Sequence, residues 1–180
     1  MDARITADEF AQHLVRRFRW IGDNRMSDLP IYHHGLEVEA VGFEAIDEGW
    51  FGVLITPWFM NAMLFPLEPE SLAVLELGTR LSGQLPSGEH AFMVGEDEEL
   101  GRYQFIPLAS PMLGYSGQEA ARDAAKAELV KLLTPPSDNP DMTAPAAPLE
   151  FAHKEDTEQL ENSDRRAFFR RFGGKGEDHS

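Results

Sequence analysis

The apolar stretch from Phe51 to Leu67 constrains the fold of this chain more than any other feature. A membrane-spanning helix needs about 20 consecutive apolar residues, and this stretch is shorter and is interrupted by polar residues and by Pro57. Proline cannot donate a hydrogen bond to a β-ladder. We therefore predict two strands, Trp50–Thr56 and Trp58–Phe65, with pairing interrupted between them. The first is nearly all apolar and should be covered on both faces.

Other segments have the patterns of antiparallel strands. Leu36–Ala40 alternates apolar and acidic residues, which is typical of a half-buried strand. Asp47-Glu48-Gly49 favours a hairpin turn that leads into the apolar strand. Further along, Ala91–Val94 and Arg102–Leu108 flank the acidic turn Glu96–Glu99 and predict another hairpin.

Two segments carry helix signals. Thr6 and Glu9 have the spacing of a capping box, ahead of apolar residues at positions 10, 14, 18 and 21, and Gly22 is the expected stop. Ser116 and Glu119 have the same spacing ahead of an alanine- and leucine-rich segment. Two consecutive prolines at 135 and 136 should end that second helix.

Together these elements predict an α+β fold, in which a mostly antiparallel sheet packs against an N-terminal and a C-terminal helix. The expected architecture has two layers, one sheet with two helices packed on it. The folded domain is expected over residues 1–134. Five prolines lie in Thr134–Pro148, so residues 135–180 are expected to form a linker and a disordered C-terminal tail.

Composition excludes several functional classes. The chain has no cysteine, which rules out thiolate metal sites, iron–sulfur ligation and a cysteine nucleophile. Its formal net charge of −15 is the opposite of what nucleic-acid binding requires. Polar residues interrupt the N-terminal segment where a secretory signal would need an apolar run. We expect a cytoplasmic protein that does not insert into membranes.

The best metal candidate is the group His33, His34 and Glu37. Adjacent histidines on an extended chain point to opposite faces, which makes it difficult for both to bind one ion. Exposed loop histidines are therefore the favoured interpretation, and no metal or cofactor is expected. A small metal-dependent hydrolase that uses this region remains an alternative function.

The segment Thr56–Pro66, which includes the second apolar strand, concentrates the residue types found at protein interfaces, which are aromatic residues and methionine. If it is a strand, Trp58 and Met60 face one side and Phe59 and Asn61 the other. One face should belong to the core, while the other is covered either by a helix or by a partner protein. The candidate partner-binding residues are Thr56, Pro57, Trp58, Phe59, Met60 and Asn61.

A second candidate segment lies near the C-terminus. Four arginines and three phenylalanines fall within nine residues from Asp164, in an otherwise acidic chain. Such a segment on a flexible tether is typical of a short linear recognition element. It is expected either to bind a partner or to fold back on the acidic domain. The candidate residues are Arg165, Arg166, Phe168, Phe169, Arg170 and Arg171.

These segments resemble the HybE family of nickel-iron hydrogenase assembly chaperones. The resemblance is carried by Ile55-Thr56-Pro57-Trp58-Phe59-Met60-Asn61, Leu85-Pro86-Ser87-Gly88 and Ser110-Pro111-Met112. The tail sequence Arg165-Arg166-Ala167-Phe168-Phe169 is similar to a short arginine-hydrophobic motif of that family. The match spans roughly Phe10 to Phe172, and its most specific part is Ile-Thr-Pro-Trp.

The resemblance implies a non-enzymatic cytoplasmic factor. Members of the family bind hydrogenase structural subunits during maturation, so the expected partners are the small or large subunit precursor and other maturation factors. Binding is expected before twin-arginine export. A structural subunit of another complex is a further alternative.

Overall fold

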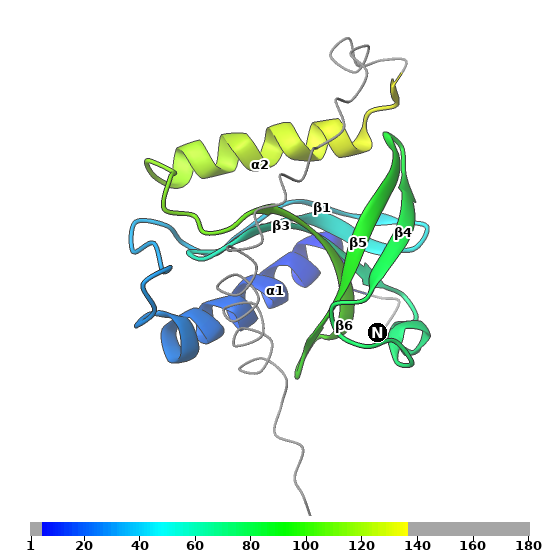
Figure 1. The fold of residues 1–180 in the computed structure, drawn as a ribbon, viewed down its shortest axis with the longest axis horizontal. Helices are drawn as coiled ribbons and strands as arrows, with labels where there is room; N and C mark the ends of the chain where they lie inside the picture. Colours follow the sequence, from blue (N-terminus) through cyan, green and yellow to red (C-terminus); the bar gives the residue numbers. More distant parts are fainter. Residues whose placement is uncertain (1–4, 137–180) are drawn as a thin grey trace, which may run out of the picture.

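A computed structural model describes residues 5–136, and its first helix, α1, spans Ala7–Ile21 (Figure 1). The capping box predicted at its start is present. The Glu9 amide donates to the Thr6 hydroxyl at 3.2 Å, and the Thr6 amide donates to the Glu9 carboxylate at 2.8 Å.

As predicted, α1 ends at Ile21 with Gly22 as its C-cap residue, and the chain then continues into a turn of π-helix, η1, over Gly22–Met26. A Cβ atom at Gly22 would lie 3.2 Å from the ring of Trp58. This glycine therefore also allows the chain to approach an indole ring closely.

Six strands form a single antiparallel sheet in the order β1-β2-β3-β6-β5-β4. The predicted hairpins are present, although several boundaries differ from the expected ones; β1, for example, begins three residues after Leu36. A short 3-10 helix, η2, at Pro69–Leu72 follows the third strand. The strands are β1 Glu39–Ile46, β2 Gly49–Ile55, β3 Met60–Pro66, β4 Arg80–Leu85, β5 Gly88–Asp97 and β6 Gly101–Ala109.

The two helices lie on opposite faces of the sheet, so the fold has three layers, in contrast to the two that the sequence predicted (Figure 1). The second helix, α2, spans Gln118–Leu133. Side chains of α1 pack with Leu54, Met63 and Phe65 in one core. Side chains of α2 pack with Phe51, Val53 and Ala62 in the other. The nearly continuous apolar sequence of β2 and β3 follows from this, because both of their faces are buried.

The start of α2 differs from the prediction. Its N-cap is Gly117, and no side chain caps it, so the expected capping box of Ser116 and Glu119 is not formed. Gln118 instead accepts a hydrogen bond from the Glu37 amide at 2.8 Å and donates to the Glu39 carboxylate at 2.7 Å. The first turn of α2 is therefore held by Glu39 at the start of β1 and by Glu37, which precedes that strand. The helix ends at Leu133, before the two prolines, as predicted.

Glu39 anchors α2 to the sheet, because Arg122 donates to its two carboxylate oxygens at 2.6 and 3.0 Å. The hydrogen bond from Arg122 lowers the pKa of Glu39, and a hydrogen bond from Gln118 adds to this against the opposing effect of burial. A carboxyl with a lowered pKa in the folded state stabilises the fold above its unfolded pKa. That stabilisation is lost as the pH falls through the folded pKa.

We predict that Glu39→Gln lowers the free energy of unfolding at pH 7 and that its difference from the wild type shrinks as the pH falls below the ordinary carboxyl value of 4.5. Urea unfolding at pH 7 and at pH 3 measures this. Glu44→Gln is the matched control, because Glu44 is an exposed acid on the same strand with no ion pair to the described residues. A difference for Glu39→Gln that is as large at pH 3 as at pH 7 would contradict the prediction.

Candidate functional site

The segment Thr56–Phe59, which contains most of the Ile-Thr-Pro-Trp motif, forms a tight turn between β2 and β3. The turn is built around the hydroxyl of Thr56. The amides of Trp58 and Phe59 donate to this hydroxyl at 3.2 and 2.9 Å, and the hydroxyl donates to the Phe59 carbonyl at 3.0 Å. The Thr56 amide donates to the same carbonyl at 2.8 Å. Pro57 has no amide hydrogen and needs no partner in the turn. The threonine and the proline thus satisfy the backbone of a buried corner.

The predicted alternation of side chains across this segment is wrong at its start. Trp58 and Phe59 belong to the same core, on the α1 side of the sheet. Their ring centroids are 5.7 Å apart, and Phe59 also meets Phe18 of α1 edge to face at 5.8 Å. The period of two applies to a strand, whereas these residues lie in the turn, and β3 begins only at Met60.

All six predicted partner-binding residues from Thr56 to Asn61 are buried in the described chain. The Trp58 ring is 1% exposed and Asn61 is 7% exposed. Tyr32 stacks on the outer side of the indole, with centroids 6.0 Å apart. The segment is therefore part of both cores of the free protein, and its contact with a partner stays a prediction.

The residues proposed as an alternative metal site are not brought together. His33 is held between backbone groups, since Nδ1 accepts from the Gly35 amide at 3.0 Å and Nε2 lies 2.9 Å from the Tyr115 carbonyl. The His34 ring lies tilted against Tyr32, with ring centroids 4.9 Å apart, and Glu37 is exposed. Within residues 5–136, no three histidine or acidic side chains are grouped so that they would hold a metal ion.

A group of charged residues that the sequence analysis left apart comes together between α1 and the β5–β6 turn. The Arg17 guanidinium donates to both oxygens of Asp97 at 2.8 to 3.0 Å, and the two residues are only 8% and 4% exposed. This hydrogen bonding raises the pKa of Arg17. Asp97 also accepts from the amides of Glu99 and Leu100. The pair therefore fixes the acidic turn against the helix.

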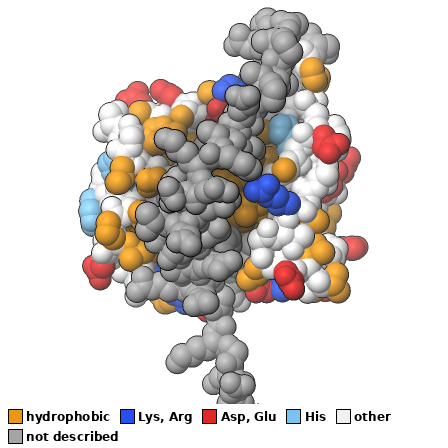
Figure 2. All heavy atoms as spheres, viewed as in Figure 1, with side chains coloured by type: hydrophobic (Ala, Val, Ile, Leu, Met, Phe, Trp, Pro, Cys, Tyr) orange, Lys and Arg blue, Asp and Glu red, His pale blue; other side chains and the backbone are white. Residues whose placement is uncertain are grey.

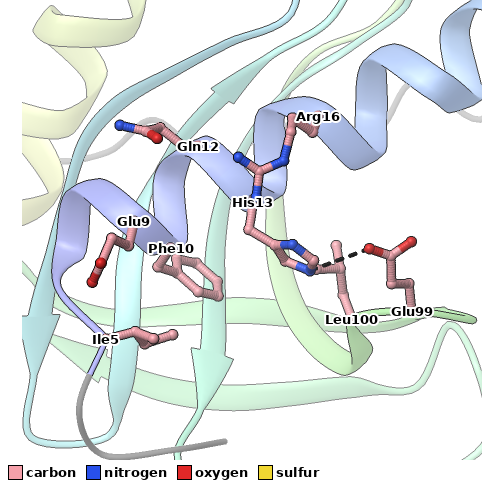
Figure 3. Close-up of a pocket in the computed structure, with 8 residues that line it drawn as sticks. All are labelled: Ile5, Glu9, Phe10, Gln12, His13, Arg16, Glu99 and Leu100. Atoms are coloured by element: carbon pink, nitrogen blue, oxygen red, sulfur yellow. Dashed lines mark ion pairs between the residues drawn. The ribbon is translucent and has the colours of Figure 1, made fainter.

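An open hollow of about 530 Å³ lies beside this pair (Figure 3). Phe10 and Leu100 are buried at its apolar part, while His13 and Glu99 at its rim approach to 3.4 Å. One helical turn further along, Trp20 is 46% exposed, and the guanidinium carbons of Arg17 and Arg25 lie 5.0 and 5.1 Å from the centroid of its ring. The sequence predicted both the helix that carries Arg17 and the acidic turn that contains Asp97. It did not show that the two meet, because they lie 80 residues apart.

The second predicted binding segment lies outside the described residues. It comprises Arg165, Arg166, Phe168, Phe169, Arg170 and Arg171. Within the described part the surface is acidic, with 20 acidic and nine basic side chains. On the face shown in Figure 2, acidic groups lie along the margin around exposed hydrophobic side chains. No helix among residues 5–136 is long and apolar enough to cross a membrane.

The chain matches one protein family along most of its length. The model of the family described as NiFe-hydrogenase assembly, chaperone, HybE matches residues 9–171. This range includes both the folded domain and the arginine-phenylalanine segment of the tail. The chain belongs to the HybE family of hydrogenase assembly chaperones.

Named relatives agree with this assignment. The chain is 38% identical to the hydrogenase expression/formation protein HupJ of Bradyrhizobium diazoefficiens, over 68% of this chain and 70% of that protein. It is 36% identical to the protein HoxT of Cupriavidus necator, over 72% of this chain and 78% of the relative. The solution structure of HybE from Escherichia coli superposes with a TM-score of 0.51 at 25% identity, covering 68% of this chain and 76% of that one.

Removal of the Thr56 hydroxyl should test the turn. Thr56→Val keeps the shape of the side chain but leaves the buried amides of Trp58 and Phe59 without their acceptor. We predict a loss of about 2–4 kcal/mol in the free energy of unfolding. Thr56→Ser retains the hydroxyl and should lose less. Urea unfolding of both variants measures this, and equal losses would show that the hydroxyl does not hold the turn.

The Arg17–Asp97 pair gives a second prediction. Asp97→Asn keeps an oxygen for the amides of the turn but leaves the buried Arg17 guanidinium only the more distant, exposed carboxylates of Glu98 and Glu99 at 3.8 and 3.7 Å, and the expected loss is about 3 kcal/mol. Combining Arg17→Met with Asp97→Asn should recover most of that loss, because no poorly paired charge is then buried and the amide side chain still accepts from the turn. A double-mutant cycle by urea unfolding compares the three variants. Additive losses in the cycle would mean that the two side chains are not coupled.

Proposed function

We propose that this chain is a non-catalytic cytoplasmic chaperone that binds a hydrogenase subunit precursor during assembly, before twin-arginine export. The observation that carries the proposal is the family match over residues 9–171. The names of the relatives, which refer to hydrogenase expression and formation and to hydrogenase operons, support the same biological process.

The features of the described domain suit a protein that binds without turnover. Two cores on opposite faces of one sheet give a rigid scaffold. The excess of acidic over basic side chains favours association with basic segments, such as a signal that begins with paired arginines.

The two binding segments then take different roles in the proposal. The arginine-phenylalanine residues Arg165–Arg171 contact the client or another maturation factor directly, as Arg and aromatic side chains commonly do in interfaces. The Thr56–Asn61 turn acts from within, because its burial fixes the positions of α1, β2 and β3. Trp58 and Phe59 are buried beneath α1, so a direct contact between this turn and the client would require α1 to move away from the sheet.

An affinity pull-down of the tagged full chain from its native host, grown with hydrogenase induced, tests the proposal. Mass spectrometry should find a hydrogenase subunit that still carries its signal peptide. A hydrogenase subunit recovered only without its signal peptide would contradict binding before export. Absence of any hydrogenase subunit or maturation factor from the eluate would contradict the chaperone function.

Two variants of the full chain serve as controls in the same experiment. Arg165→Glu combined with Arg166→Glu reverses two charges of the tail segment and should reduce recovery of the client. Lys175→Glu reverses a charge outside that segment and should leave recovery unchanged. Equal recovery with all three chains would exclude the paired arginines as a contact.

A further inference from the structure

The two edges of the sheet differ in how they are protected. Strand β1 carries a bulge between Val41 and Glu44, with Gly42 in a left-handed conformation at φ +63°, and both helices contact this strand. Bulges and covering elements are the usual means by which proteins prevent an edge strand from pairing with another chain. The β1 edge is therefore closed.

Strand β4 at the opposite edge has an irregularity only just before its start, where the Gly78 amide and the Thr79 carbonyl both bond to Val94. Its six residues pair with β5 in unbroken register, and it is the last strand in the order of the sheet. The strand contains neither proline nor lysine. Figure 1 shows β4 at the rim of the sheet, with no described element on its outer side. One row of its backbone amides and carbonyls has no partner strand in the described chain.

The hairpin turn identifies which backbone groups point outward. Two residues, Pro86 and Ser87, join β4 to β5, and Leu85 is paired with Gly88 across the turn. The pair that closes a two-residue hairpin loop shares hydrogen bonds, and bonded and non-bonded pairs then alternate along the ladder. Gly83 and Leu81 therefore bond to β5. The outward amides belong to Arg80, Ser82 and Gln84, whose side chains are also exposed.

Side chains beside the edge define what an added strand would meet. Gly83 has no side chain, and the ring of Phe92 lies across it, since a Cβ atom there would be 2.6 Å from the ring. Leu81 is half-buried beside the same ring. An added strand would place alternate side chains against this apolar strip. The edge therefore fits an extended segment without proline that has apolar residues at every second position.

We propose that the β4 edge binds an extended segment of the hydrogenase subunit precursor as a seventh strand of the sheet; this inference rests on the proposed function. Backbone pairing recognises an extended chain largely independently of its sequence, which suits a client that has not yet assembled. The acidic surface favours a neutral or basic segment. It disfavours a second copy of this chain at the same edge, because each copy carries a net charge of −15.

The test compares Ser82→Pro with Ser82→Ala in the full chain. Both remove the hydroxyl, but only proline removes the outward amide and blocks close approach of another strand. Binding to the purified precursor from the pull-down should weaken roughly tenfold or more with Ser82→Pro and stay unchanged with Ser82→Ala. Equal binding by both variants would overturn the proposal while leaving the proposed function intact. Failure of the wild-type chain to bind the precursor would instead reject the proposed function and this inference together.

Amide hydrogen exchange of the wild-type chain gives an independent measurement in case the proline variant does not fold. The amides of Ser82 and Gln84 should exchange fast in the free chain and become protected when the precursor is added. The Gly83 amide should be protected in both states. Protection of Ser82 and Gln84 in the free chain would place a second copy or the chain's own tail at this edge, and would overturn the proposal. Unchanged exchange in the complex would overturn it as well.

Discussion

Burial of β2 and β3 on both faces is the constraint on which the rest of this structure depends. Two adjacent strands with no polar face need a cover above and below, so the helices must lie on opposite sides of the sheet. The chain then needs a corner between the two strands that leaves no buried backbone group unpaired. The Thr56 hydroxyl provides that corner, with three hydrogen bonds inside a four-residue turn. The Ile-Thr-Pro-Trp motif is thus explained first by folding.

Local patterns predicted the elements well, because short-range contacts determine them. The capping box of Thr6 and Glu9 and the hairpin at Asp47–Gly49 depend on residues close in sequence. The failures have tertiary causes. The side chain of Gln118 binds β1, and no capping box forms at the start of α2. Period-two alternation was applied to Trp58 and Phe59, where a hydroxyl-centred turn replaces the strand.

The candidate site was less predictable than the fold. Aromatic and methionine residues favour both cores and interfaces, so composition alone did not distinguish the two environments of the Thr56–Asn61 segment. The Arg17–Asp97 pair joins positions 80 residues apart, and each partner has a sufficient local interpretation. Arg17 suits the end of a helix, and Asp97 suits an acidic turn. The resemblance to the family was drawn from short motifs, and the family match over residues 9–171 does not depend on whether any one of those residues touches a partner.

The order of the strands gives the β4–β5 hairpin an unusual position in the chain. Strand β3 pairs directly with β6, although β4 and β5 come between them in the sequence. These two strands form a hairpin on the far side of β6, at the edge of the sheet. The hairpin is tied to the rest of the domain by more than its pairing with β6, because Asp97 is bound to α1, and Leu85 and Phe92 are buried in the core on the α2 side. The Ser87 amide in its turn also donates to the Leu132 carbonyl of α2 at 3.2 Å. The outer hairpin is therefore a second support for the C-terminal end of α2, and a change in its length would disturb the core beneath that helix.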